Sequence, residues 1–239
     1  MIWSKQELDI LIKYYADKGD SHVSRLINRS TNAVRVKAFR MDLRRFDRDI
    51  NLSYNEKQII LGSLIGDMHC RIRKRNPQIE EAHSRKQEGY LLWKLSQLKK
   101  LTFTLWETNI GALQFESRVY PFLNYYYKLF YGNGKKQISN EILDQLDTLG
   151  LAVWYMDDGS YNKKGNSCRI HTNGFSYKEN VLIKNWFEKR WRLFPKIYSL
   201  LLRGKRYYII NFNVKETKRF IKIVNPYIHR SMRYKVGYY

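Results

Sequence analysis

Two aspartates, Asp67 and Asp158, occupy matched places in the 239-residue sequence, each at the end of an apolar run of helical length. Two helices that cross near these ends would bring the carboxylates together, and the small residues Gly62 and Ala152 would permit a close approach. Neighbouring carboxylates repel each other unless protons or cations lie between them. Paired oxygen ligands suit Mg²⁺. The pattern predicts a divalent-metal site able to generate hydroxide and to stabilise an in-line displacement at phosphorus.

Each aspartate also has an ordinary structural interpretation. The glycine after Asp158 fits a helix terminus, and aspartate is common in turns. Either pattern alone would favour a turn. Its repetition behind two apolar helices favours a functional site.

The charge of the chain indicates a polyanionic partner. Lys and Arg number 44 against 22 Asp and Glu, which gives a net charge of +22 at pH 7. Self-repulsion of this size argues against most enzymes of small neutral metabolites. The charges are spread along the chain instead of forming one amphipathic helix, so nucleic acid is favoured over a membrane surface. Apolar residues make up 44% of the chain, which excludes a disordered basic tail.

Apolar stretches, the first residues of the sequence and the cysteines indicate the cellular compartment. We find neither an apolar stretch of about 20 residues for a membrane span nor a signal-peptide layout at the start. Cys70 and Cys168 lack the spacing of a zinc site or a disulfide framework, which favours a reducing compartment. We expect a bacterial or phage protein of the cytoplasm, or an organellar one, that is not secreted and has no membrane partner.

The chain after residue 55 looks duplicated. The segments predicted in the first half are strands Met68–Asn76 and Gln78–Arg85, helix Tyr90–Leu101, strand Ala112–Val119 and helix Phe122–Tyr131. Those in the second half are strand Ser167–Asn173, helix Val181–Trp191, strands Lys196–Leu202 and Tyr207–Asn213, and helix Glu216–Val224. With its acidic helix, each half is interpreted as α-β-β-α-β-β-α, and three of the four strands of each half are located in the sequence. The sequence predicts an α+β core of two pseudo-symmetric halves, about 56–147 and 148–239.

Residues 1–46 predict a small unit of three helices. Ser4 and Glu7 form a capping box before the first helix. The third helix places Arg35, Lys37 and Arg40 off its apolar line, where a recognition helix carries its DNA contacts. The segment resembles Myb/SANT-like helix-turn-helix domains. The alternative is a basic three-helix cap that only packs on the main body. Residues 47–55 are a plausible linker, in which Ser53 could cap the next helix.

The two acidic runs resemble the motifs of the LAGLIDADG homing endonucleases in their single-chain form. Residues 151–160, LAVWYMDDGS, match closely, whereas residues 61–68, LGSLIGDM, match more loosely because Met68 replaces the usual Gly or Ala. The resemblance covers about residues 56–239 and implies that the sheets of both halves are antiparallel and bind DNA. It implies a site-specific endonuclease that cuts both DNA strands and leaves short 3′ overhangs. The implied metal-binding set is Asp67, Asp158, Gly66 and Asp157, with Mg²⁺ as cofactor and Mn²⁺ as a substitute; catalysis is not assigned to Asp157.

The resemblance also implies one lysine from each half near the scissile phosphates. Lys136 and Lys235 match those positions, and Lys135 is the alternative in the first half. These ammonium groups would orient water or stabilise phosphorane charge. Ordinary contact with the phosphate backbone is the other interpretation.

Strand alternation then predicts a surface for reading the major groove. The predicted contacts in the core are Arg71, Arg73, Arg75, Gln78, Arg85, Lys163, Arg169, His171, Asn173, Arg203, Arg206 and Asn211. A solvated strand face is the alternative for each residue alone, and the positive charge of the set argues against it.

The sequence therefore predicts a metal-dependent DNA endonuclease that acts as a monomer on double-stranded DNA. Two alternatives remain open on the same fold. One is a non-cleaving maturase with intron RNA as its partner, and the other is a DNA-binding transcription regulator. Cleavage is favoured because both carboxylates are present.

Overall fold

A computed structural model describes residues 3–43, 50–73 and 76–237. The chain divides into two units, Met1–Asn51 and Leu52–Tyr239. Among the described residues, no helix has both the length and the apolar character needed to cross a membrane. Arg75, a predicted DNA contact, lies outside the described residues.

The first unit contains the three predicted helices, α1 (Lys5–Lys18), α2 (Asp20–Ile27) and α3 (Thr31–Arg40). Serine caps begin two of them. The Ser4 hydroxyl accepts a hydrogen bond from the Glu7 backbone N–H while the Glu7 carboxylate accepts one from Ser4, which completes the predicted capping box. Ser30 caps α3 in the same way, by accepting from the N–H of Ala33.

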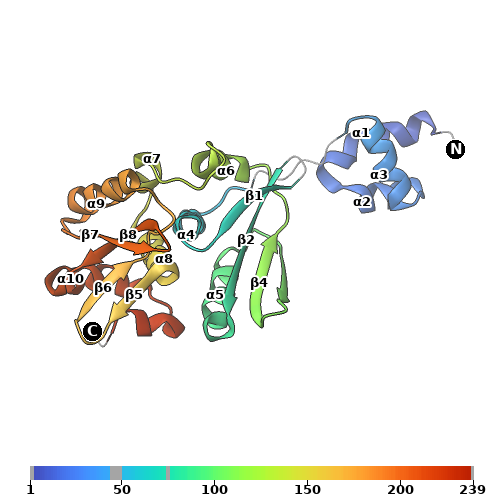
Figure 1. The fold of residues 1–239 in the computed structure, drawn as a ribbon. Coiled ribbons are helices and arrows are strands. Elements are labelled where there is room, and N and C mark those ends of the chain that lie inside the picture. Colours follow the sequence, from blue (N-terminus) through green and yellow to red (C-terminus); the bar gives the residue numbers. More distant parts are fainter. Residues whose placement is uncertain (1–2, 44–49, 74–75, 238–239) are drawn as a thin grey trace. The chain divides into compact units, whose positions relative to one another are not determined.

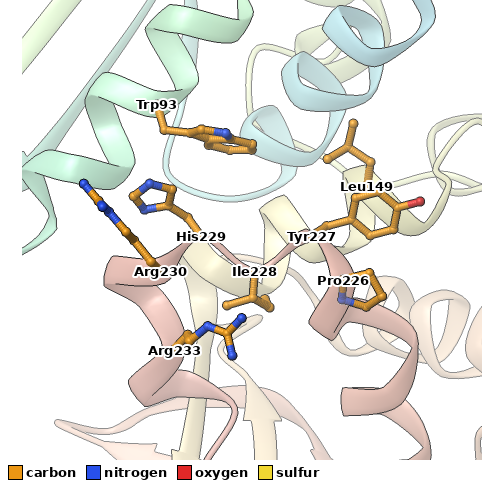
Figure 2. A pocket seen from close by; sticks show the side chains of 8 residues that line it. All are labelled: Trp93, Leu149, Pro226, Tyr227, Ile228, His229, Arg230 and Arg233. Atoms are coloured by element: carbon orange, nitrogen blue, oxygen red, sulfur yellow. The ribbon is translucent and has the colours of Figure 1, made fainter.

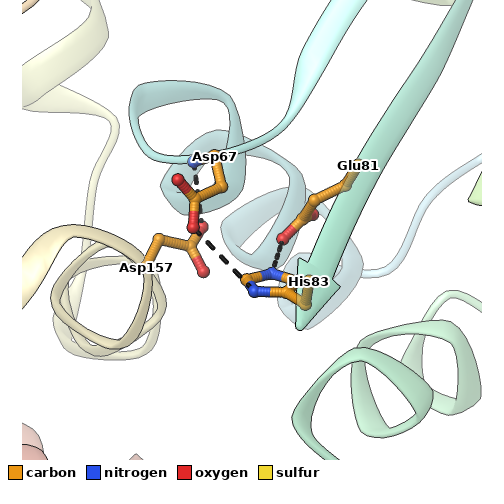
Figure 3. Close-up of side chains that lie close together, drawn as sticks. All are labelled: Asp67, Glu81, His83 and Asp157. Carbon is orange, nitrogen blue, oxygen red and sulfur yellow. Dashed lines mark hydrogen bonds and ion pairs between the residues drawn. The ribbon is translucent and has the colours of Figure 1, made fainter. Parts of the chain in front are cut away.

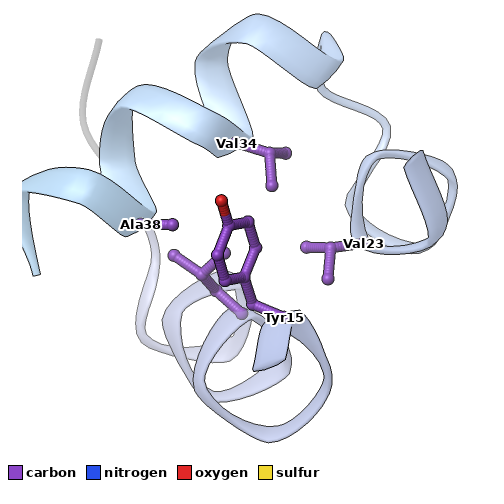
Figure 4. Packing of buried hydrophobic residues seen from close by; sticks show 5 residues of the cluster. Tyr15, Val23, Val34 and Ala38 are labelled. Atoms are coloured by element: carbon purple, nitrogen blue, oxygen red, sulfur yellow. The ribbon is translucent and has the colours of Figure 1, made fainter. Parts of the chain in front are cut away.

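Apolar side chains from all three helices meet in the core of this unit (Figure 4). The fully buried residues Leu11, Val23, Val34 and Ala38 surround the ring of Tyr15. This arrangement follows from the sequence spacing, because residues three or four apart lie on one face of a helix.

The second unit repeats one supersecondary pattern (Figure 1). The elements of its first half are α4 (Tyr54–Ile65), β1 (His69–Arg73), β2 (Asn76–Ser84), a 3₁₀ turn (Arg85–Gln87), α5 (Glu88–Gln97), β3 (Phe103–Glu107), β4 (Ala112–Ser117), α6 (Leu123–Tyr131) and the short α7 (Asn140–Asp144). Those of the second half are α8 (Thr148–Asp158), β5 (Gly159–Asn162), β6 (Ser167–Ile170), α9 (Tyr177–Trp191), β7 (Lys196–Leu202), β8 (Lys205–Phe212), α10 (Val214–Val224) and the 3₁₀ turns Asn225–Tyr227 and Arg230–Lys235.

Each half builds a four-stranded antiparallel sheet of the same order, β1-β2-β4-β3 in the first and β5-β6-β8-β7 in the second. The predicted α+β fold of two equivalent halves is thus confirmed. Two short strands, β3 and β5, were not predicted. The predicted end of β6 was wrong, because the strand ends at Ile170 and not at Asn173. His171 and Asn173 consequently lie in the loop after the strand.

Helices α4 and α8 pack directly on each other between the two sheets, and both are buried over almost their whole length. Ser53 begins α4 as predicted, because its hydroxyl accepts from the N–H of Glu56. A Cβ at Gly62 would lie 2.2 Å from the carbonyl oxygen of Gly150, which means that the two backbones touch. The close approach expected from Gly62 is therefore present, and the glycine that faces it is Gly150. This contact sets how closely the two helices pack.

Candidate active site

The ends of α4 and α8 open into one pocket of about 350 Å³. Asp67, just past the end of α4, and Asp158, the last residue of α8, both line it. The full lining is Ile65, Gly66, Asp67, His69, Lys135, Lys136, Asp158, His171, Gly174 and Phe175. The structure therefore brings together the two carboxylates that the sequence singled out.

The pocket disfavours two negative charges without a cation. Burial raises the pKa of Asp158 to about 7, and repulsion from the carboxylates of Asp67 and Asp157 adds to the rise. The indole N–H of Trp154 donates to Asp158 at 3.2 Å and partly offsets this effect. A divalent cation would relieve the same repulsion, and a carboxylate pair offers it hard oxygen ligands.

Two lysines bind the backbone at the ends of the acidic helices in equivalent ways. The Lys136 ammonium donates to the carbonyls of Gly66 at 2.8 Å and Met68 at 3.1 Å. Lys235 donates to the carbonyls of Met156 at 2.5 Å and Asp157 at 2.8 Å. A cation at a helix C-terminus complements the exposed carbonyl dipoles. Burial lowers the pKa of both lysines, against the raising effect of the nearby aspartates.

Asp157 differs from its neighbour Asp158 because its carboxylate points into the protein. It accepts hydrogen bonds from the Lys94 ammonium at 2.7 and 2.9 Å and from the Tyr90 hydroxyl at 2.8 Å. Its second oxygen lies 3.4 Å from the backbone N–H of Asp67. Asp157 thus links the end of α8 both to α5 and to the loop after α4.

Asp67, Glu81, His83 and Asp157 form a cluster with the composition of a metal site (Figure 3). Their ligand atoms all lie within 4.8 Å of one another. The cluster already contains a cation, however, because the fully buried Lys94 ammonium also donates to Glu81, at 2.5 Å.

The charges in this cluster compensate one another. Burial alone would lower the pKa of Lys94, but Asp157 and Glu81 raise it above its ordinary value. Burial would likewise lower the pKa of His83, but the bond between its ring and the Glu81 carboxylate raises it. Lys94 therefore stays charged and neutralises Glu81 and Asp157. The His83 ring also lies 4.0 Å from the Asp67 carboxylate. Among the described residues, Asp158 forms no ion pair.

A second pocket, of about 430 Å³, lies at the opposite end of α8 (Figure 2). Its lining is Trp93, Leu149, Pro226, Tyr227, Ile228, His229, Arg230 and Arg233. Leu149 is nine residues before Asp158, roughly 14 Å along a helix. The two pockets share no lining residue.

Comparison with known proteins decides the family. A family model described as the LAGLIDADG DNA endonuclease family matches residues 57–220. The chain belongs to the LAGLIDADG DNA endonuclease family. The resemblance seen in residues 61–68 and 151–160 is thereby confirmed.

Among curated relatives of this LAGLIDADG chain, protein RecA of Mycobacterium shimoidei is 30% identical over 200 residues, which are 77% of this chain and 47% of that protein. The intron-encoded endonuclease ai4 of Dictyostelium discoideum is 34% identical over 125 residues, 52% of this chain and 76% of that protein. The fold is similar to that of the homing endonuclease I-WcaI bound to its DNA recognition sequence, with a TM-score of 0.66 and 22% identity over 79% of this chain and 88% of that one. The chain spans about half the length of the RecA relatives that it matches.

The open face of the first LAGLIDADG sheet is polar and internally paired. Arg71 forms ion pairs with Glu80 at 2.5 Å and Glu116 at 3.8 Å. Gln78 is buried on this face and donates to Glu116 at 2.8 Å. Arg73 is exposed at the end of β1. Arg71 and Gln78, both predicted DNA contacts, are thus held by protein partners in this structure.

Arg85 does not extend β2 as predicted but begins the 3₁₀ turn that follows it. Its guanidinium pairs with the carboxylates of Glu88 and Glu107. Any contact of Arg85 with DNA would therefore come from the rim of the sheet.

The second sheet carries its predicted contacts at several places. Arg169 on β6 pairs in register with Asn211 on β8, so both share the open face. His171 lines the acidic pocket and lies 2.9 Å from the Ser160 hydroxyl.

Arg206 is five residues before Asn211 and thus points to the other face of the strand. Asn173 is exposed in the loop after β6, Lys163 in the turn after β5 and Arg203 in the turn between β7 and β8.

The predicted contacts of the N-terminal unit lie on α3. Arg40 is exposed, and Arg35 is exposed but pairs with Asp20 at 2.6 Å. The Lys37 ammonium lies 6.0 Å from the ring centre of Trp3. The helix thus presents Arg40 and Arg35 outward, while Lys37 packs against the unit itself.

Sequence reasoning missed the buried cluster of Glu81, His83 and Lys94. A signal was present, because Glu81 and His83 alternate on a predicted strand and so share one face. Their neighbour in that alternation, Ile79, is fully buried, which places the two charged groups on the core side. Lys94 gave no signal of its own, since a lysine in an amphipathic helix is ordinarily exposed.

We predict that Lys94→Met lowers the free energy of unfolding by about 3–5 kcal/mol, because it leaves Glu81 and Asp157 buried without their cation. Urea denaturation followed by circular dichroism measures the change. Lys99→Met, at an exposed position nearby, is the matched control and should change stability by less than about 0.5 kcal/mol. Equal effects of the two substitutions would contradict the role of Lys94.

A second prediction follows from the raised pKa of Asp158. The folded protein holds this proton up to about pH 7, whereas an unfolded aspartate releases it near pH 4. Stability without metal therefore falls as the pH rises through this range. Asp158→Asn should stabilise the metal-free protein by about 2 kcal/mol at pH 8 and by almost nothing at pH 4.

Urea unfolding in EDTA at both pH values measures this difference, with the exposed Asp144→Asn as the control. If Asp158→Asn raised the free energy of unfolding at pH 8 no more than the control does, the charge of Asp158 would not destabilise the metal-free protein.

Proposed function

We propose that this chain is a site-specific DNA endonuclease that hydrolyses one phosphodiester bond in each strand of a duplex. The observation that carries the proposal is the pocket in which Asp67 and Asp158 meet at the ends of two equivalent helices. Family membership supports it. The two equivalent sheets that flank the helices agree with a long duplex target, one half-site facing each sheet.

Asp67 and Asp158 would hold a divalent metal, Mg²⁺ or Mn²⁺, with the Gly66 carbonyl close by. When bound, the metal neutralises phosphate charge and supplies activated water for attack at phosphorus. Asp157 of the predicted ligand set would instead hold the helix ends through Lys94. The Glu81–His83–Asp157 cluster fits a metal less well, because the Lys94 ammonium already lies among its oxygens.

Lys136 and Lys235 would act from the two sides of the cut. Each ammonium is fixed on the carbonyls beside an acidic residue. Fixed cations at such places attract the scissile phosphates and stabilise charge that develops on them without reorganising. Lys135 also lines the pocket but is exposed, so it suits a contact with the phosphate backbone.

Residues 1–46 would form a helix-turn-helix that adds DNA contacts outside the core site, with 47–55 as the linker. Support comes from α3, whose outward side carries Arg35 and Arg40. These cations would neutralise phosphates and make binding more dependent on salt. Intron RNA as a partner, a regulator without cleavage, the monomeric state and a bacterial, phage or organellar location stay predictions of the sequence.

We expect that Asp67→Asn and Asp158→Asn each abolish strand cleavage in Mg²⁺ and leave DNA affinity within about threefold, because the amide keeps the shape and loses the charge that a metal needs. Cleavage of a plasmid library and a gel-shift assay on the selected site measure the two properties. Asp144→Asn, an exposed carboxylate on α7, should cut at the wild-type rate. Wild-type cleavage by either pocket variant would refute the mechanism.

The role of the N-terminal unit has its own test. The double variant Arg35→Gln, Arg40→Gln should reduce the slope of log affinity against log salt by about 2, close to one per lost phosphate contact. Lys5→Gln, Lys13→Gln on the exposed side of α1 is the control for charge alone. If the slope of log affinity against log salt were identical in the wild type and both variants, the N-terminal unit would not contact DNA.

A further inference from the structure

The hairpin β7–β8 exposes large apolar side chains at alternate positions. Tyr198, Leu200 and Leu202 are 48%, 48% and 62% exposed. Alternation along a strand puts all three on one face. Exposed apolar patches of this kind ordinarily mark a binding site.

This face is the open side of the second sheet. Tyr198 pairs in register with Ile209, Leu200 with Tyr207 and Lys196 with Asn211. Asn211 in turn pairs with Arg169. The opposite face holds Ile210 and Phe212, which are fully buried under the helices. The three apolar residues, named here the β7 stripe, thus continue the surface proposed to face DNA.

The corresponding face of the first sheet has a different chemistry. Strand β3 stands where β7 stands in the second sheet and presents Thr104 and Trp106 on its open side. Next to them are Gln114 and Glu116 of β4, followed by the paired Arg71 and Glu80. Hydrogen-bonding groups therefore dominate the first sheet, whereas large apolar groups dominate the outer part of the second.

A major groove offers these two surfaces different partners. Arginine, glutamine and carboxylate side chains read base edges through hydrogen bonds, while the 5-methyl of thymine is the groove's apolar feature. From this contrast we infer that the β7 stripe recognises thymine methyl groups, and that the half-site facing the second sheet is rich in A·T pairs. The inference rests on the proposed function and specifies the substrate of the same surface.

Charge on the hairpin favours DNA over a protein partner. Lys196 and Lys205 share the face of the β7 stripe at its two ends, and Arg203 lies in the connecting turn. Both lysines and Arg203 are exposed. Apolar residues framed by cations suit a groove whose walls are phosphates. An apolar protein surface would leave these cations without counter-charges.

Thymine methyls can be removed from the target without any change in the protein. The experiment first selects cleaved sites from a random duplex library with Mg²⁺. Synthetic duplexes of the selected site then carry deoxyuridine in place of thymidine at one position at a time, and gel-shift titration gives each affinity. We expect losses of about three- to tenfold at several positions, all within one half-site, and less than twofold in the other.

Two variants link the effect to the stripe. In Leu200→Ser, the difference in affinity between thymidine and deoxyuridine duplexes should fall to less than twofold. Leu201→Ser is the control, because Leu201 is 70% exposed but pairs with Arg206 on the other face, and it should keep the difference. Thermal melting of both variants shows whether they are folded.

Equal affinity of the wild-type protein for thymidine and deoxyuridine duplexes would overturn the inference. So would methyl-sensitive positions scattered over both half-sites. If Leu200→Ser kept the affinity difference between thymidine and deoxyuridine duplexes, residues outside the β7 stripe would recognise the methyl groups, which contradicts the inference. Failure of the proposed function looks different, because no DNA would then be cut or selected in the first step.

Discussion

The backbone contact between α4 and α8 joins the two halves of the core. Gly62 and Gly150 allow the two helices to touch, and a Cβ at Gly62 would collide with the carbonyl of the facing helix. A similar restriction holds at Gly66, where a Cβ would lie 2.6 Å from the side chain of Asp157. Because the helices lie this close along their length, Asp67 and Asp158 at their ends open into one pocket.

Asp157 and Asp158, which are adjacent at the end of α8, have different environments. The Asp157 carboxylate turns inward, where Lys94 and Tyr90 hold it. Asp158 turns outward into the pocket, where burial and Asp67 raise its pKa. One carboxylate is thus neutralised by the protein, and the other is left to be neutralised by something that binds. Lys235 ties both to a single geometry through the Asp157 carbonyl.

The sequence predicted what local pattern and repetition determine. The duplicated order of helices and strands, the caps at Ser4 and Ser53, and the meeting of the acidic pair all follow from periodicity or from matched motifs. Strand β5 was missed because its four residues, Gly159–Asn162, lie inside the turn that ends the second motif. The end of β6 was misplaced because alternation of side chains continues beyond the last strand pair at Ile170.

Tertiary contacts account for the remaining differences. Lys94 is buried only because Glu81 comes from β2 and Asp157 from α8, and no spacing within α5 reveals that meeting. The pairing of Arg71 with Glu80 and Glu116 likewise depends on the register of three strands. Such contacts join residues far apart in the chain, where sequence pattern carries little information.

The proposed mechanism requires that Asp67 and Asp158, and not Glu81, His83 and Asp157, hold the metal. Crystals of the DNA complex grown with Mn²⁺ test it most directly, through the anomalous signal of the metal. We expect an anomalous peak within bonding distance of carboxylate oxygens of both Asp67 and Asp158. A peak among Glu81, His83 and Asp157, with none at Asp158, would contradict it.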